Sequence, residues 1–266
     1  MTVTPELQRR ITQSATVLAV APGHWRLTVP AGSSGRYRLA QLDDYQRRRR
    51  SAFPWRPPLR LNLRARVSHA TLPGTWGFGL WNDPFTLSMG LGGTAHRLPA
   101  LPNAAWFFYA SASNYLALRD THPAHGFLAA TFSSANIPVP LLAVATPALP
   151  LLAWPLPARH LRQLARRLVQ EDAAQLKTEP TAWHTYGLEW RADRMCFFLD
   201  GDPCCDTTIA PRPPLGLVLW IDNQYAAFPP TGRLRFGRLA NPEAAWLELA
   251  DIEVQTPSQR EIIPGA

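Results

Sequence analysis

Alternating apolar and polar residues run along much of the chain, and this pattern predicts strands. In residues 59–68, leucine, alanine and valine occupy every second position, while arginine, asparagine and serine fill the positions between them. A period of two puts the apolar side chains on one face of a half-buried strand. Similar patterns predict strands at residues 25–29, 76–81, 104–111, 115–119 and 126–133, and later in HTYGLEW, MCFFLDG, GLVLWID, RLRFGRL and AWLELADIEVQ. The chain is therefore predicted to be all-β.

One segment breaks this pattern with a helical period. Residues 158–177 are predicted to form a helix with an apolar stripe of Leu161, Leu164, Ala165, Leu168 and Leu176, and with Arg159, Arg162, Arg166 and Arg167 largely off it. The apolar residues 137–157 that precede it carry a proline every few positions, which excludes a membrane-spanning helix. Residues 137–177 fit either a cover packed over the sandwich edge or a basic amphipathic surface that docks to a membrane or a protein partner.

Composition supports a single globular unit. Hydrophobic residues make up 46% of the chain and charged residues 17%, with 10 tryptophans and 27 prolines. This content is ample for a core, and the prolines suit strands joined by rigid loops. We expect one domain over residues 1–266, with an insertion at 137–180 and a polar tail at 257–266. The charged, proline-broken residues 41–58 are predicted to be loop.

The net charge of +8 does not by itself indicate a nucleic-acid partner. It is almost entirely arginine, which together with abundant alanine, proline and leucine is typical of a high-GC bacterial genome. The densest run, residues 47–50, lies beside Asp43 and Asp44 in a polar stretch, which favours a solvated loop over a phosphate-binding patch. No nucleic-acid-binding motif accompanies it, so no such partner is predicted.

The N-terminus and the cysteines bear on location and cofactors. The first residues, MTVTPELQRRITQ, contain no apolar signal core. Cys196, Cys204 and Cys205 form neither a disulfide framework nor, with the scattered histidines, a zinc-ligand spacing. We therefore expect a cytoplasmic protein without a metal or another cofactor.

Two stretches carry a resemblance to a known family. WHTYGLEWRADRMCFFLDG, residues 183–201, closely resembles a strand pair of glycoside hydrolase family sixteen, and residues 59–81 resemble the family's arginine-rich strand, Pro-Gly turn and tryptophan strand. PLGLVLWIDN and AWLELADIEVQ follow as weaker similarities in the same order. The resemblance implies a concanavalin-like jelly-roll of two antiparallel sheets, with a sugar-binding cleft on its concave face.

The same resemblance implies two catalytic carboxylates, which this chain lacks at the expected place. The family carries E-x-D-x-x-E or E-x-D-x-E on the strand after the tryptophan strand, but here no glutamate occurs between Glu6 and Glu171. Near the C-terminus, Glu248, Asp251 and Glu253 resemble the motif in composition. Their spacing, however, predicts that Glu248 faces away from the other two, and they lie on the closing strand.

Three functions remain open. The favoured one is binding of a carbohydrate or glycoconjugate without catalysis. The second is hydrolysis by rearranged acids, Asp222 and Asp83, which must approach within about 5 to 10 Å of each other. The third is binding of an apolar ligand in a cleft capped by residues 137–177.

Aromatic and polar residues near strand ends are the candidate ligand contacts. Trp81 shares a strand face with Gly77 and Gly79, so another group can approach the backbone there beside an aromatic ring. His184 is predicted to be a hydrogen-bonded structural residue, because it has no nucleophile partner. The complete set of candidate ligand-binding residues is Trp81, Trp106, Tyr109, Trp220, Asn223 and Tyr225.

Overall fold

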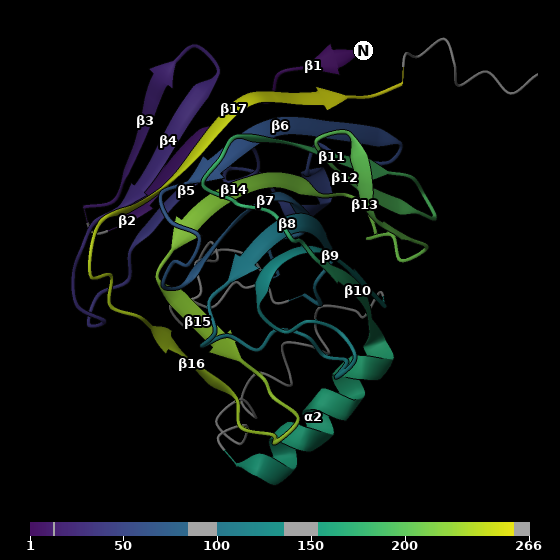
Figure 1. The fold of residues 1–266 in the computed structure, drawn as a ribbon. Coiled ribbons are helices and arrows are strands. Elements are labelled where there is room, and N and C mark those ends of the chain that lie inside the picture. The colour runs from purple at the N-terminus through teal and green to yellow at the C-terminus, as the bar shows by residue number, and fades with distance from the viewer. Residues whose placement is uncertain (13, 85–99, 136–153, 258–266) are drawn as a thin grey trace, which may run out of the picture.

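The alternating segments pair into two curved antiparallel sheets stacked face to face (Figure 1). The computed structural model describes residues 1–12, 14–84, 100–135 and 154–257. The first sheet contains eight strands: β1 (Thr2–Val3), β3 (Thr16–Ala21), β4 (His24–Val29), β6 (Leu59–Val67), β11 (His184–Trp190), β12 (Met195–Leu199), β13 (Asp202–Thr207) and β17 (Ala245–Gln255). Seven of them lie in the order β13-β12-β11-β6-β17-β4-β3, and β1 pairs with β17.

The second sheet contains seven strands in the order β10-β9-β8-β7-β14-β5-β2. They are β2 (Gln8–Thr12), β5 (Leu39–Asp43), β7 (Thr75–Trp81), β8 (Ala104–Ala110), β9 (Gly126–Ser134), β10 (Val169–Gln175) and β14 (Gly216–Asp222). A separate hairpin joins β15 (Gln224–Ala227) to β16 (Arg235–Arg238), and η1 (Arg50–Ala52) is one short 3-10 turn. This hairpin and α2 (Pro155–Leu168) lie beyond the concave face of the seven-stranded sheet (Figure 1). This face points away from the core between the sheets and is called the inner face below.

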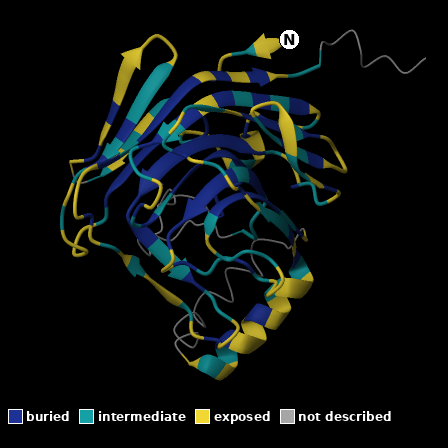
Figure 2. Ribbon diagram, in the orientation of Figure 1, coloured by how far each residue is buried: buried dark blue, intermediate teal, exposed yellow. Residues whose placement is uncertain are grey.

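The core fills the space between the two sheets. In β6 every second side chain, from Leu59 to Val67, is buried against the other sheet, as the alternation predicts. Trp76, Phe78 and Leu80 of β7 meet them from the opposite side. The strands of the seven-stranded sheet are buried on both faces over much of their length (Figure 2), so its inner face is covered as well. The cleft described below lies between this face and the segments that cover it.

The helix is shorter than its sequence pattern predicts and turns a different face inward. It ends at Leu168, and residues Val169–Gln175 form β10, paired with β9 along its whole length. Ala158 and Arg162 are its buried residues, whereas Leu161 and Leu164 of the expected apolar stripe are exposed. Arg162 lies inward because it donates hydrogen bonds to the carbonyls of Ala117 and Phe228.

Two further predictions of local structure were wrong. Residues 39–43 form β5, an interior strand between β14 and β2, although residues 41–58 were expected to be loop. Residues 115–119 form no strand, and Tyr115 makes only an isolated bridge to Ala227. Residues 137–153 of the predicted insertion, and most of the predicted tail, lie outside the described residues. Among the helices described here, none has the length and apolar character needed to cross a bilayer.

Candidate ligand-binding cleft

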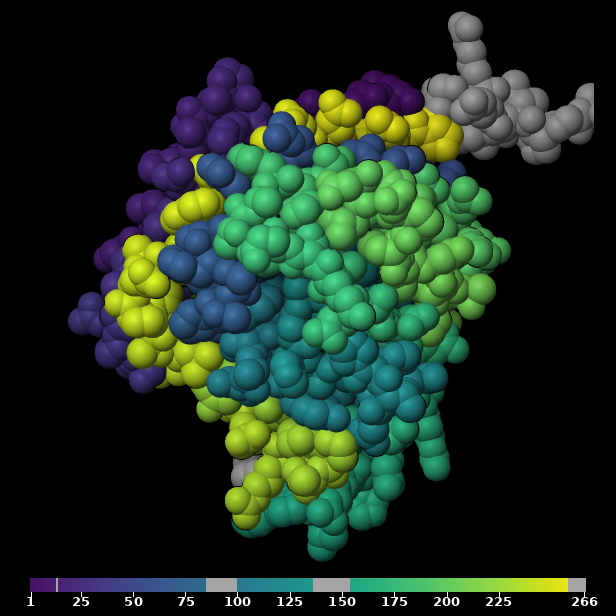
Figure 3. Space-filling view, in the orientation of Figure 1, coloured from purple at the N-terminus to yellow at the C-terminus, as the bar shows by residue number. Residues whose placement is uncertain are grey.

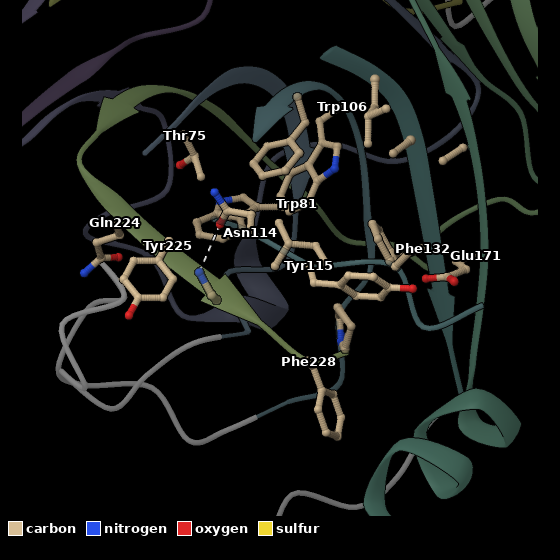
Figure 4. A pocket seen from close by; sticks show the side chains of 18 of the residues that line it. Thr75, Trp81, Trp106, Asn114, Tyr115, Phe132, Glu171, Gln224, Tyr225 and Phe228 are labelled. Atoms are coloured by element: carbon tan, nitrogen blue, oxygen red, sulfur yellow. Dashed lines mark hydrogen bonds between the residues drawn. The ribbon is translucent and has the colours of Figure 1, made fainter. Parts of the chain in front are cut away.

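A cavity of about 530 Å³ lies on the inner, concave face of the seven-stranded sheet (Figure 4). Its floor comes from β5, β14, β7, β8, β9 and β10, and its walls come from residues 114–118, 122–123 and 224–228. Most of the lining side chains are aromatic or aliphatic. Figure 3 shows α2 beside the segment around β16 at the lower end of the molecule, where Arg159 donates to the carbonyl of Thr231.

Two glycines on β7 make room for the aromatic floor. A Cβ on Gly77 would lie 2.5 Å from the carbonyl oxygen of Phe107 and 2.8 Å from the ring of Trp220. A Cβ on Gly79 would lie 2.4 Å from the carbonyl oxygen of Ala105 and 2.5 Å from Cα of Trp106. The groups that approach the backbone here are thus neighbouring strands and tryptophans. Only glycine permits that approach without displacing them.

The tryptophans named from the sequence meet on this floor. Trp106 lies 5.9 Å from Trp81 and 5.6 Å from Trp220 between ring centroids. Trp81 donates from Nε1 to the Tyr45 hydroxyl at 2.7 Å, and Trp220 donates to Thr75 Oγ1 at 3.0 Å. Trp81 and Trp106 are only half-buried, so parts of their rings remain open to a ligand. Tyr225 also lines the cavity, from the β15 wall.

Asp222 lies at one end of the cleft and is held by three donors. Its Oδ1 accepts from Thr75 Oγ1 at 2.8 Å and from the Gln224 backbone N–H at 3.2 Å, and its Oδ2 accepts from the Tyr37 hydroxyl at 3.3 Å. Burial raises the pKa of Asp222 to about 6, although these hydrogen bonds act in the opposite direction. Burial and the nearby charge of Asp222 raise the pKa of Tyr37 well above its usual value, so this hydroxyl remains a donor.

Glu171 lies at the opposite side of the cleft (Figure 4). Its carboxylate accepts the backbone N–H groups of Leu118 and Arg119 and thereby fixes the wall loop. Arg162 fixes the same loop from α2, with Nη2 2.7 Å from Asp120 Oδ1 and its guanidinium 5.4 Å from the centre of the Tyr115 ring. Sequence reasoning missed this carboxylate as a site residue, because it placed Glu171 in the predicted helix.

The structure does not bring the two candidate acids together. Asp83 follows the Trp81 end of β7, whereas Asp222 pairs with Thr75 at the other end. β7 is seven residues long, which at about 3.3 Å per residue amounts to about 20 Å. Asp83 is fully buried outside the cavity lining, and its charge helps raise the pKa of Tyr45, after burial itself.

Two other candidates face away from the cleft. Tyr109 alternates with Trp106 and Phe108, so its ring lies in the core between the sheets, stacked on Trp76 at 5.6 Å. Asn223 is fully buried just beyond β14. Its side chain accepts from the Arg38 N–H and donates to the Arg36 and Leu239 carbonyls, so it joins chain segments and does not contact a ligand.

A buried carboxylate pair, Asp43 and Asp44, lies at the C-terminal end of β5, next to the cleft residue Gln41. Asp43 accepts from Gln41 Nε2 at 2.9 Å and from two backbone N–H groups, and burial raises its pKa. Asp44 accepts from the Trp55 indole and from the Leu217 N–H, and burial raises its pKa to about 7. These aspartates were predicted to lie in a solvated loop. They are buried because β5 runs through the sheet interior and each carboxylate accepts several hydrogen bonds there.

The acidic residues of β17 lie on the far side of the sandwich. Glu248 pairs across the sheet with Arg66, and Glu253 pairs with Asn62. A bulge between Ala250 and Glu253 resets the alternation, so Glu248 and Glu253 share the outer face, contrary to the prediction from spacing. His184, as predicted, is a hydrogen-bonded structural residue, with Nδ1 2.6 Å from Asp200 Oδ2.

No metal site is evident in the described part of the chain. Across residues 1–12, 14–84, 100–135 and 154–257, no group of three His, Cys, Asp or Glu side chains has an arrangement that could hold an ion. Cys196, Cys204 and Cys205 are free thiols, and burial raises the pKa of Cys204 to about 11 and that of Cys205 to about 12. These two thiols are therefore protonated near neutral pH and are weak ligands and nucleophiles.

Comparison with known proteins reveals the fold without a family assignment. No protein-family model matches the chain, and no curated protein matches its sequence. The endo-β-1,4-glucuronan lyase from the fungus Trichoderma reesei superposes with a TM-score of 0.50 at 10% identity, over 94% of this chain and 90% of that one. The β-glucanase of Bacillus licheniformis gives 0.46 at 8% identity over 94% and 92%, and LamAcat from Zobellia galactanivorans gives 0.47 at 12% over 89% and 79%.

At these identities the likeness shows the fold alone. Over the described residues the chain is a concanavalin-like jelly-roll, a β-sandwich of two antiparallel sheets with helix α2 before β10. This confirms the fold class predicted from the sequence.

Proposed function

We propose that the protein binds a carbohydrate or glycoconjugate in the concave cleft and does not hydrolyse it. The observation that carries this proposal is the floor of the cleft. On β8, the strand on which the resemblance places the catalytic carboxylates, Trp106 and Phe108 face the cavity. Open tryptophan faces are apolar platforms for sugar rings, and Asp222, Gln224 and Tyr225 supply polar groups at the margin.

The separation of the carboxylates argues against a catalytic pair. Retaining and inverting glycosidases need carboxyl groups about 5 to 9.5 Å apart. Asp222 is about 20 Å from the Asp83 end of β7. The pairing register aligns Glu171 with Gly216, at the other end of β14 from Asp222, so the two carboxylates are about 20 Å apart along the strand direction. Asp222 and Glu171 are also committed to hydrogen bonds within the protein. Fold precedent keeps hydrolysis through Asp222 as an alternative.

Calorimetric titration with soluble oligosaccharides tests the proposal. We expect binding by the wild type and a loss of at least about tenfold in Trp106→Ala, since a stacked aromatic ring contributes about 1.4 kcal/mol or more. Trp183→Ala is the matched control, because Trp183 is also half-buried but packs against Arg64 and Arg66 of the eight-stranded sheet. Equal losses in both variants would contradict the proposal.

The catalytic alternative has its own readout. Incubation of the wild type and Asp222→Asn with β-glucans, followed by an assay for new reducing ends, separates binding from hydrolysis. We expect no product from either protein. Product from the wild type that disappears in Asp222→Asn would overturn the non-catalytic proposal.

The apolar character of the lining favours one second candidate, an apolar ligand. Leu39, Leu116, Leu128 and Leu234 line the cavity together with the aromatic rings. A dodecyl-chain probe that binds where all soluble glycans fail, and that Trp106→Ala weakens, would support this candidate over a sugar. A membrane surface as the partner, which the sequence of 137–177 suggested, stays a prediction, as do the bacterial cytoplasmic origin and the lack of a nucleic-acid partner.

A further inference from the structure

A second, polar pocket of about 370 Å³ adjoins the aromatic cleft. Ala100 lines both cavities, and Trp81 of the cleft is followed directly by Asn82 of the second pocket. The two spaces are therefore neighbours at the Trp81 end of β7. The second pocket is lined by Arg50, Ser51, Asn82, Ala100, Leu101, Asn103, Ser134, Ala135, Arg212, Pro213 and Pro214.

The charge of this pocket differs from that of the cleft. Its described lining contains two arginines and no aspartate or glutamate, whereas Asp222, Glu171 and Asp172 line the cleft. The formal charge of the lining is thus positive. A pocket of this kind attracts an anionic group, and guanidinium groups match the geometry of carboxylates and sulfates.

Each arginine is placed in a different way. Arg50 is held in position, with Nε 2.7 Å from the Asn82 carbonyl and Nη2 2.8 Å from the Asp83 carbonyl. Arg212 is exposed, and within the described residues its guanidinium makes no hydrogen bond or ion pair, although its backbone N–H donates to Asn103 Oδ1 at 2.9 Å. One arginine is fixed and the other can adjust, which suits a charged group that enters from the cleft.

The polar frame of the pocket is rigid. Asn82 Oδ1 accepts from the Asn103 N–H at 3.0 Å, and Asn82 Nδ2 donates to the Leu101 carbonyl at 2.8 Å. Asn103 Oδ1 accepts from Ser134 and Arg212, so its amide NH₂ is the part of this side chain that a ligand can use. The Asn103 amide NH₂ and the Arg212 guanidinium are therefore donors that the pocket offers to a ligand.

We propose that this second pocket binds the carboxylate or sulfate group of an acidic glycan whose sugar rings lie on Trp81 and Trp106. The inference rests on the proposed function of the cleft and names its ligand class. A glycan with acidic substituents uses both cavities, whereas a neutral glycan of the same backbone uses only the aromatic one.

The test compares matched neutral and acidic oligosaccharides by calorimetry at low and moderate salt. The pairs are cellohexaose against the β-1,4-linked glucuronate hexamer, and neutral galactan against sulfated galactan fragments. In whichever pair the protein binds, we expect the acidic oligosaccharide to bind about tenfold more tightly than the neutral one. Arg212→Gln should reduce this preference to about twofold or less. Arg212→Lys, which keeps the charge, restores part of the preference.

Arg191→Gln is the matched control, because it removes the same charge from an exposed arginine in the turn between β11 and β12 of the eight-stranded sheet. It leaves the preference unchanged if the pocket itself recognises the anion. Equal binding of neutral and acidic members, or equal effects of Arg191→Gln and Arg212→Gln, overturns the pocket and leaves the proposed function standing. Failure of every glycan to bind overturns the proposed function, and this inference with it.

Discussion

The two sheets turn very different surfaces away from the shared core. On the eight-stranded sheet, charged and aromatic groups satisfy one another: Glu248 is buried between Arg26 and Arg66, and both guanidinium groups stack on Trp246. On the seven-stranded sheet, the rings of Trp81 and Trp106 contact each other and line a cavity. Aromatic residues are thus common to both surfaces. What marks the second as a site is that its half-buried tryptophans line a cavity.

The largest expected effect comes from replacing Gly79 of β7, which lets Trp106 of β8 pack close to the β7 backbone. Gly79→Ala places a methyl group within 2.6 Å of three atoms of Ala105 and Trp106, two of which belong to the backbone. We expect a loss of about 3 kcal/mol or more in the free energy of unfolding, because backbone cannot move aside as a side-chain end can. Urea denaturation measures it. Gly35→Ala is the control, since its Cβ would meet only Ser33 Oγ at 3.7 Å. A similar stability for both variants would refute this account of the inner face.

The next prediction concerns how Asp222, on the inner face, makes the free energy of unfolding depend on pH. Its pKa rises from 3.8 to about 6 on burial, so between these values the unfolded chain loses its proton before the folded one. Stability from this group is fully present below about pH 4 and is lost as the pH rises through about 6, by about 3 kcal/mol at most. Asp222→Asn should flatten this part of the stability profile, measured by urea denaturation at pH 4 to 7.

Asp202→Asn provides the control for that measurement. Asp202 is exposed at the start of β13 on the other sheet, and its substitution should leave the profile as in the wild type. A profile for Asp222→Asn that matches the wild type would show that burial of this carboxyl does not govern stability in that range.

The outer face should respond in the opposite direction to acid. The hydrogen bonds and charges of Arg66 and Arg26 outweigh burial and lower the pKa of Glu248. Its contribution is therefore present above the unfolded-state pKa and is lost as the pH falls through the folded-state pKa. Glu248→Gln should cost about 1.5 kcal/mol at neutral pH and less in acid. An unchanged unfolding free energy at pH 7 would mean that the arginines are equally well satisfied by water.

How much of this contrast the sequence could predict depends on the element. The alternation in β6, β7 and β8 was enough to predict which side chains share a face of each strand. The same alternation could have predicted that Tyr109 and Trp106 lie on opposite faces of β8. β10 was missed because VQEDAAQ contains good helix formers, and only its pairing with β9 makes it a strand. The site residues that depend on it, Glu171 above all, could not be found from local pattern.

Hydrogen bonds that compensate buried charged groups explain the other misses. Asp43 was placed in a loop because residues 41–58 are charged and broken by prolines, but its donors lie within the same strand and the following turn and compensate its burial. Arg162 looked like a surface residue of an amphipathic helix. Its acceptors come from residues 117, 120 and 228, far away in the sequence. No local period reports such partners.

The smallest expected effect tests whether the ion pairs of the outer face are individually important. Arg64 lies 3.4 Å from Asp251, and both side chains are well exposed. A double-mutant cycle with Arg64→Gln and Asp251→Asn should give a coupling energy of about 0.5 kcal/mol or less, because water and salt screen exposed pairs. A coupling energy above about 1 kcal/mol would show that the outer network acts as one unit. The contrast with the inner face would then lie in cooperativity as well as in pairing.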